Sequence, residues 1–132
     1  MTHLLDTSAL LAFYLQEPGL DAVKAILKNP DHEVGLSAPS VLEFWSALHR
    51  RNLADRFEAE WQLLQPLFSE VVPVTETVAA RAIQLRRQTP ARLPAIDALI
   101  AATAAVQGAV LVHRDPHFRA IPENLLRQEY LG

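Results

Sequence analysis

Leu4-Leu5-Asp6-Thr7-Ser8-Ala9-Leu10 passes from a short apolar run to an acid and then to a helical pattern. The two leucines predict a buried strand that ends at Asp6. Thr7 or Ser8 can cap a helix that runs through Leu15 and stops before Pro18. The same succession of strand and helix returns along the chain. Expected strands cover residues 4–5, 33–37, 71–74 and 109–112, and expected helices cover 7–15, 20–27, 40–51, 54–68, 75–88 and 94–107.

This alternation predicts a mostly parallel sheet with helices on both faces, which is a three-layer α/β/α architecture. Ligands of such sheets bind beyond the carboxyl ends of the strands. Asp6 follows the first expected strand, and Asp115 follows the last. If these two strands are neighbours, the two carboxylates converge.

Length and composition indicate one globular domain covering residues 1–132. The absence of cysteine excludes a disulfide scaffold, a thiolate zinc site and a cysteine nucleophile. No secretory signal is visible, and the apolar segment 98–106 is too short to span a bilayer. We therefore expect a cytoplasmic protein without membrane association. The net charge of −3 argues against a protein that coats nucleic acid without specificity. Every lysine or arginine after Lys28 is an arginine, however, so a local arginine patch that binds nucleic acid remains possible.

Two of the acids have a structural interpretation beside a functional one. Asp6 can cap the helix that follows it, or it can bind a metal ion with Thr7 or Ser8 as polar neighbours. Glu43 ends Ser40-Val41-Leu42-Glu43, which matches a capping box in which the glutamate bonds back to the backbone of Ser40. A glutamate in the first turn of a helix can also face a cleft, so both roles remain open.

Asp97 is the only charged residue between Leu93 and Gly108. A helix this apolar is buried on most sides, and a buried carboxylate needs a partner or a metal ion. A salt bridge to Arg92 or another arginine is the structural interpretation. Asp115 precedes Pro116, a pair that is also common at the start of turns. We expect His113 and His117 to lie near the surface or beside ligands rather than to bind metal themselves.

Four acids without cysteine or a helical histidine pair indicate oxygen ligands, which select hard cations such as Mg²⁺ or Mn²⁺. Carboxylates brought together repel each other unless a cation neutralises them. The usual task of such a cluster is to activate water and to stabilise charge during displacement at a phosphodiester.

At these residues the chain resembles a PIN-domain ribonuclease, specifically a VapC-type toxin of a bacterial type II toxin–antitoxin pair. The resemblance covers essentially the whole chain. It rests on four segments in order, Leu4 to Leu11, Ser40 to Phe44, Leu93 to Ala102 and Leu111 to Asp115.

The resemblance implies a sheet with the first and fourth strands adjacent and a magnesium-dependent endoribonuclease activity, with Mn²⁺ able to substitute. It implies that Asp6 and Asp97 are the main metal ligands and that Glu43 and Asp115 complete the acidic cluster, with Asp115 also binding the metal. It further implies a homodimer in complex with a small VapB-type antitoxin. The sequence departs from many relatives at His113, where they carry threonine, and at His117, where they carry an acid.

For RNA contact we predict four arginines whose alternative role is a solvated helix face. They are Arg86, Arg87, Arg92 and Arg114. Arginine binds phosphate through paired hydrogen bonds, and such binding is sensitive to salt. Trp45, Trp61 and Phe57 lie in helical patterns and are expected in the core or a dimer interface.

Two other function classes compete with a nuclease. An aspartate-nucleophile phosphatase would place its nucleophile at Asp6, but it requires an acid at position 8, where Ser8 stands, and a suitably placed lysine. A non-catalytic PIN-fold binding module would not require all four acids.

Overall fold

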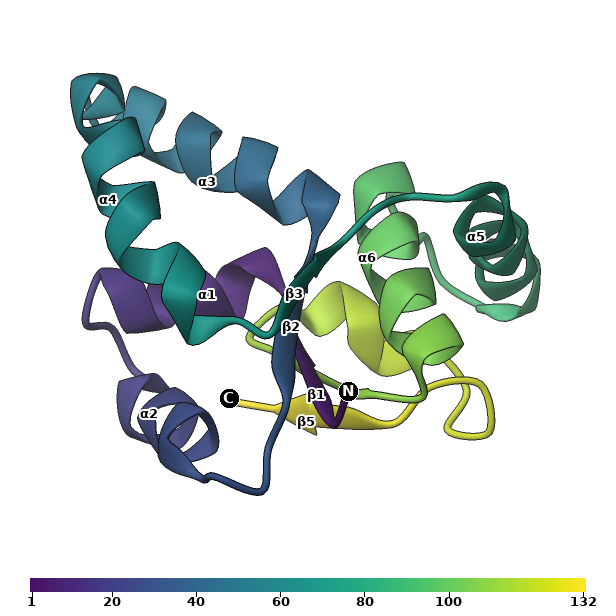
Figure 1. Cartoon of the computed structure of the whole chain (residues 1–132). Coiled ribbons are helices and arrows are strands. Elements are labelled where there is room, and N and C mark those ends of the chain that lie inside the picture. The colour runs from purple at the N-terminus through teal and green to yellow at the C-terminus, as the bar shows by residue number, and fades with distance from the viewer.

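The computed structural model describes residues 1–132 and contains one sheet of five strands (Figure 1). The strand order is β3-β2-β1-β4-β5, and every pair of neighbours is parallel. The strands are β1 (His3–Leu5), β2 (Val34–Ser37), β3 (Glu70–Val72), β4 (Val110–His113) and β5 (Gln128–Tyr130). The expected parallel sheet is confirmed.

β1 lies at the centre of the sheet, with β2 on one side and β4 on the other. Leu5 is in register with Leu36 of β2 and with Val112 of β4. The ladder continues one residue further, because the backbone N–H of Asp6 donates to the carbonyl oxygen of Val112 over 2.9 Å. The predicted adjacency of the first and fourth strands is therefore confirmed, and it brings Asp6 to the end of β4.

Six helices cover the two faces of the sheet (Figure 1). They are α1 (Thr7–Tyr14), α2 (Leu20–Lys28), α3 (Ala38–Arg50), α4 (Phe57–Leu64), α5 (Glu76–Gln88) and α6 (Ala95–Gln107). The core on one face contains Leu5 and Val112 together with α1 to α4, and the core on the other face contains Leu4 and Leu111 together with α5 and α6. Successive strand residues thus point to opposite layers, which explains why both members of the pairs Leu4-Leu5 and Leu111-Val112 are apolar. None of the helices is both long enough and apolar enough to span a membrane.

α6 is the most deeply packed helix, with Ala98, Ile100, Ala101 and Thr103 among its buried residues. Its small side chains let it lie close to the sheet and to α5. The helix ends at Gly108, which adopts φ +65° and so takes the left-handed position that a side chain would disfavour.

Some element boundaries differ from those expected. Asp6, rather than Thr7 or Ser8, caps α1, and its side chain accepts a hydrogen bond from Ser8 N. The third helix begins at Ala38 and not at Ser40, because Pro39 is accommodated in its first turn. The chain from 54 to 67 is a short α4 between two 3-10 turns, η1 (Ala54–Arg56) and η2 (Gln65–Leu67). The tail adds η3 (Pro116–Ala120) and β5, which the sequence did not predict.

Candidate active site

A cleft of about 340 Å³ opens at the carboxyl end of the sheet and contains all four predicted acids. Asp6 lies between β1 and α1, and Glu43 lies on α3. Asp97 lies on the first turn of α6, and Asp115 follows β4. The cleft residues are Asp6, Thr7, Ser8, Leu11, Glu43, Ser46, Arg50, Asp97 and Asp115. Four segments that are far apart in the sequence therefore supply carboxylates to one place.

Asp6 is only 3% exposed and is held by its neighbour Ser8. Its Oδ2 accepts hydrogen bonds from the backbone N–H of Ser8 over 3.0 Å and from Ser8 Oγ over 2.6 Å. Ser8 Oγ in turn accepts a hydrogen bond from the backbone N–H of Arg114 over 2.9 Å. The capping role of Asp6 is therefore real, and Ser8 ties it to the loop that carries Asp115.

Glu43 is held by Thr7 and not by a capping box. Thr7 Oγ1 donates to Glu43 Oε1 over 2.5 Å and also lies 3.0 Å from Ser40 Oγ. Ser40 cannot act as the cap, because Ser37 is the N-cap of α3 and Ser40 lies inside the helix. The capping-box interpretation is wrong, and Glu43 is oriented instead by a side chain of α1.

Asp97 has no arginine partner, although the sequence left that possibility open. Its side chain is 16% exposed, and the one basic group beside it is His117, whose Nδ1 lies 3.6 Å from Asp97 Oδ2. The same Nδ1 lies 2.8 Å from Asp115 Oδ1. Asp115 Oδ1 also accepts a hydrogen bond from the backbone N–H of His117, which fixes the turn between the two residues.

The cleft is electrostatically unfavourable for its own carboxylates. The pKa of Asp6 is raised to about 7, mainly by burial and to a smaller extent by the charges of Asp97 and Glu43, against the hydrogen bonds from Ser8. Burial also raises the pKa of Asp97 to about 6, with Asp115 and Glu43 adding to the rise and His117 opposing it. Buried carboxylates that repel each other are typical of a site that binds a cation.

The donors in the cleft fit a divalent cation. Its lining contains four carboxylates and a single basic residue, Arg50, with no lysine. One ligand atom each from Asp97, Asp115 and His117 lie within 4.8 Å of one another. Carboxylate oxygens are the ligands preferred by Mg²⁺ and Mn²⁺. The absence of lysine also removes the second requirement of the aspartate-nucleophile phosphatase.

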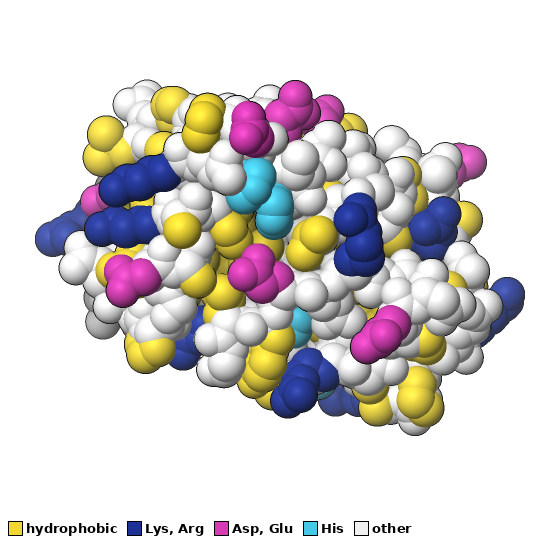
Figure 2. All heavy atoms as spheres, turned by 90° about the horizontal axis from the view of Figure 1, so that it is seen from below, with side chains coloured by type: hydrophobic (Ala, Val, Ile, Leu, Met, Phe, Trp, Pro, Cys, Tyr) yellow, Lys and Arg dark blue, Asp and Glu magenta, His cyan; other side chains and the backbone are white.

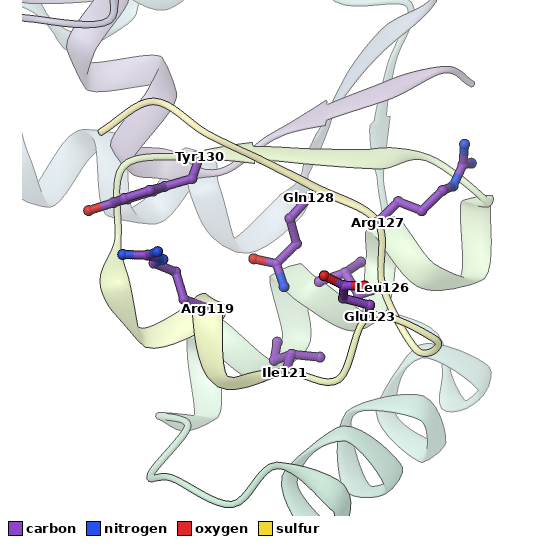
Figure 3. A pocket seen from close by; sticks show the side chains of 7 residues that line it. All are labelled: Arg119, Ile121, Glu123, Leu126, Arg127, Gln128 and Tyr130. Atoms are coloured by element: carbon purple, nitrogen blue, oxygen red, sulfur yellow. The ribbon is translucent and has the colours of Figure 1, made fainter.

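A larger hollow of about 520 Å³ lies elsewhere, beside β5 and the end of η3 (Figure 3). Its lining shares no residue with the acidic cleft and carries one acid, Glu123, near two arginines. Arg119 stacks over the ring of Tyr130 at one end, with 4.7 Å between guanidinium carbon and ring centre. On volume alone, this hollow would be the better candidate for a functional site. The smaller cleft is the one that brings four carboxylates together, and carboxylates can bind a metal ion or transfer a proton.

A chain of hydrogen bonds through the buried His113 connects Asp115, at the acidic cleft, with Gln128, at the larger hollow. The backbone N–H of Asp115 donates to His113 Nδ1 over 3.2 Å, so the proton of the neutral ring lies on Nε2 and is donated to Gln128 Oε1 over 2.8 Å. Gln128 Nε2 completes the chain by donating to the carbonyl oxygen of Phe118 over 2.9 Å. Burial lowers the pKa of His113, which agrees with a neutral ring. His113 therefore supports the backbone of Asp115 and does not lie in the cleft.

We expect Gln128→Leu to destabilise the protein by about 1–3 kcal/mol, because it leaves the buried Nε2–H of His113 without an acceptor. The exposed neighbour Glu129 offers a control, and Glu129→Gln should stay within about 0.5 kcal/mol. Urea unfolding of the three proteins measures both effects. Equal midpoints for Gln128→Leu and Glu129→Gln would show that the hydrogen-bond chain does not hold this region.

The four arginines proposed for RNA contact lie outside the cleft. Arg114 lies at its margin, with NH1 3.5 Å from Glu17 Oε1. Arg86 and Arg87 end α5, and Arg92 lies in the short connection to α6. α5 and α6 are in contact, and the connection that contains Arg92 leads from the carboxyl end of α5 to the first turn of α6, where Asp97 lies (Figure 1). The face seen from below shows no continuous basic surface, since its lysines and arginines are interspersed with acids and apolar side chains (Figure 2).

Sequence reasoning missed two residues that line the cleft, namely Ser46 and Arg50. Glu43, Ser46 and Arg50 are spaced at i, i+3 and i+7, so one face of α3 presents all three to the cleft. That spacing is a signal that could have found Arg50. His117 lies half-exposed beside the acids, which agrees with the expected position near the surface or beside ligands, and the η3 turn brings its ring there.

The comparisons with known proteins agree with this geometry. The sequence matches the PIN domain family over residues 3–124. A chain of FitAcB from Neisseria gonorrhoeae is 26% identical with a TM-score of 0.77, and the match covers 98% of this chain and 98% of that chain. A chain of VapBC2 from Rickettsia felis bound to a promoter DNA fragment is 18% identical with a TM-score of 0.78 and the same coverage of both chains, 98% and 98%.

VapC20 from Mycobacterium tuberculosis, described as a sarcin-ricin loop cleaving toxin, is 22% identical with a TM-score of 0.70. That match covers 90% of this chain and 94% of VapC20. The comparison with curated proteins found no significant match. The family match spans most of the sequence and includes all four acids of the cleft, so the chain belongs to the PIN domain family.

Proposed function

We propose that this protein is a metal-dependent endoribonuclease and the toxin of a type II toxin–antitoxin pair of the VapC type. The observation that carries the proposal is the convergence of Asp6, Glu43, Asp97 and Asp115 in one cleft at the carboxyl end of a parallel sheet. Membership of the PIN domain family and the likeness to a toxin described as cleaving the sarcin-ricin loop support the same activity.

In this proposal Asp6, Asp97 and Asp115 hold the divalent cation, which is Mg²⁺ with Mn²⁺ able to substitute. When bound, such an ion activates water and stabilises negative charge on the phosphodiester. Ser8 fixes the carboxylate of Asp6, and Thr7 fixes that of Glu43. We propose that Glu43 accepts a proton within the cleft and that Arg50, which also lines it, binds a phosphate oxygen.

RNA cleavage by the purified protein, with Mg²⁺ and with EDTA, tests this proposal. A generic phosphomonoester is assayed in parallel. We expect metal-dependent RNA fragments and no phosphomonoester hydrolysis. Hydrolysis of the monoester without RNA cleavage would support a phosphatase instead, and neither reaction would support a non-catalytic binding module. Mapping of cut ends in cellular RNA after induction then identifies the target.

Protein partners belong to the same proposal. We propose a single PIN domain over residues 1–132 that acts in the cytoplasm, as a homodimer bound by a small VapB-type antitoxin. Exposed apolar side chains support protein contacts at α3 and α4, where Leu42 is 64% exposed and Leu63 is 73% exposed. Trp45 is also partly exposed, whereas Trp61 and Phe57 pack against the core, as their helical pattern predicted.

We expect the double variant Arg86→Gln/Arg87→Gln to bind RNA more weakly and with less dependence on salt. Each lost phosphate contact on a single strand lowers the slope of log affinity against log salt by about 0.7, so two contacts lower it by about 1.4. Binding is measured by fluorescence anisotropy in EDTA, which prevents cleavage.

Lys24→Gln/Lys28→Gln is the matched control, because it removes the same charge from exposed positions of α2. α2 leads into the amino end of β2, at the opposite edge of the sheet from the acids. If both double variants lose affinity equally, Arg86 and Arg87 form a solvated face and make no special contact with RNA.

A further inference from the structure

His117 has a position that the acidic cluster alone does not explain. Its Nδ1 lies 2.8 Å from Asp115 Oδ1 and 3.6 Å from Asp97 Oδ2, so one ring atom faces both carboxylates. No other histidine ring forms an ion pair with a carboxylate of the cleft, and His113 contacts Asp115 only through the backbone N–H of that residue. Two carboxylates and one imidazole nitrogen therefore form a compact group of three donors.

The spacing of these donors matches the edges of a metal coordination shell. Ligands about 2.1 Å from an octahedral ion lie about 3 Å apart when they are adjacent. The two distances that involve Nδ1 lie on either side of this value. One ligand atom from each of the three residues lies within 4.8 Å of the others, so the group is compact enough to surround a single ion.

The turn that carries His117 fixes the ring in this position. Pro116 restricts the backbone, and the Asp115 side chain accepts a hydrogen bond from the backbone N–H of His117 over 2.9 Å. Phe118, the next residue, is fully buried and anchors the turn in the core. The side chain of His117 itself is 53% exposed, so its place beside the acids is not imposed by packing of the ring.

We infer that His117 contributes a nitrogen ligand to the cation held by Asp97 and Asp115, and that this ligand shifts the site from Mg²⁺ toward first-row transition ions such as Mn²⁺ and Co²⁺. Mg²⁺ is bound almost entirely by oxygen, whereas imidazole suits transition ions. The inference rests on the proposed metal-dependent function and deepens it, because it concerns which ion the cleft selects. It also gives a role to a residue that the sequence placed outside the ligand set.

Direct metal binding to the metal-free full chain tests the inference. Mg²⁺, Mn²⁺ and Co²⁺ are titrated by calorimetry into the wild type, His117→Ala and His117→Asp. We expect the wild type to bind Mn²⁺ and Co²⁺ at least ten times more tightly than Mg²⁺. His117→Ala should lose at least tenfold in affinity for the transition ions and much less for Mg²⁺, and His117→Asp should narrow the difference between the ions.

His49→Ala is the matched control, because His49 is exposed on α3 and does not line the cleft. It should bind all three ions as the wild type does. Pulsed electron paramagnetic resonance gives a second readout, since Mn²⁺ bound by the wild type and by His49→Ala should show coupling to a directly bonded histidine nitrogen. This coupling should disappear in His117→Ala while Mn²⁺ remains bound to the carboxylates.

Unchanged or tighter binding of Mn²⁺ by His117→Ala would overturn the inference, because it would make the imidazolium a mere counter-charge for the two acids. Absence of nitrogen coupling in the wild type would also overturn it. Metal-dependent RNA cleavage in either case would leave the proposed function intact. Failure of the wild type to bind any of the three ions would instead refute the proposed function together with the inference.

Discussion

Asp6→Asn and Asp97→Asn are each expected to reduce RNA cleavage by more than about 100-fold. Loss of a group that merely orients a metal ligand costs about 10- to 100-fold, so loss of a ligand should cost more. Each substitution keeps the shape of the side chain and removes one charge. If both carboxylates hold the same ion, the double variant should cleave scarcely less than either single variant, because residues that act as a unit are strongly non-additive.

Folding should survive these changes. Burial already raises the pKa of Asp6 to about 7, so a neutral amide at this position avoids the cost of a buried charge. Asparagine is also a good N-cap and can accept the hydrogen bonds that Ser8 donates. Asp21→Asn, at an exposed position on α2, is the control for the charge change alone. Circular dichroism checks the fold, and near-normal cleavage by either single variant would remove Asp6 or Asp97 from the metal site.

The sequence was sufficient to predict the central strands β1 and β4, because each of them contains a short apolar run. Leu4 and Leu5 are buried on opposite faces, as are Leu111 and Val112, so both positions of each pair must be apolar. β5 could not be found in this way. It is an edge strand made of Gln128, Glu129 and Tyr130, and two of these side chains are exposed, so its pattern is that of a loop.

The site could be predicted as far as topology determines it. Asp6 and Asp115 follow strands that lie side by side, and a parallel sheet brings their carboxyl ends together. The contact between Thr7 and Glu43 was beyond the sequence, because it joins two helices whose relative position is set by packing. The local pattern at Ser40 suggested a cap, but the start of the helix at Ala38 made that pattern irrelevant.

The sequence alone could predict that the carboxylates of the cleft are costly to ionise, but not which groups surround each of them. The sequence shows that Asp97 lies in an apolar helix, and the structure adds that Asp115, Glu43 and His117 surround it. His113 is a similar case, because the buried ring is hydrogen-bonded by Gln128, which lies on the unpredicted strand β5. The sequence therefore could not predict the contacts that His117 on η3 and Gln128 on β5 make around the site.

The stability of the metal-free protein should fall as pH rises from about 4 to about 7. In this range the folded state retains protons on Asp6 and Asp97, whose pKa values are about 7 and about 6, while the unfolded chain releases them near pH 4. The folded state thus binds more protons, and raising the pH removes that advantage. Thermal unfolding in EDTA across this range measures the slope, which should be smaller in Asp6→Asn.

A divalent cation should reverse this loss, because it binds the native cluster and neutralises the carboxylates that repel each other. Binding to the folded state alone contributes about 2.7 kcal/mol at a hundredfold excess of ion over its dissociation constant, which corresponds to roughly 10 °C in Tm for a chain of this size. We therefore expect Mg²⁺ or Mn²⁺ to raise the Tm at pH 8 by several degrees in the wild type and in Asp21→Asn. Asp97→Asn should show a distinctly smaller rise, since it has lost one ligand but keeps the rest of the fold. Equal rises in Asp97→Asn and the wild type would mean that Asp97 does not bind the ion, and that the ion stabilises the protein from somewhere other than this cleft.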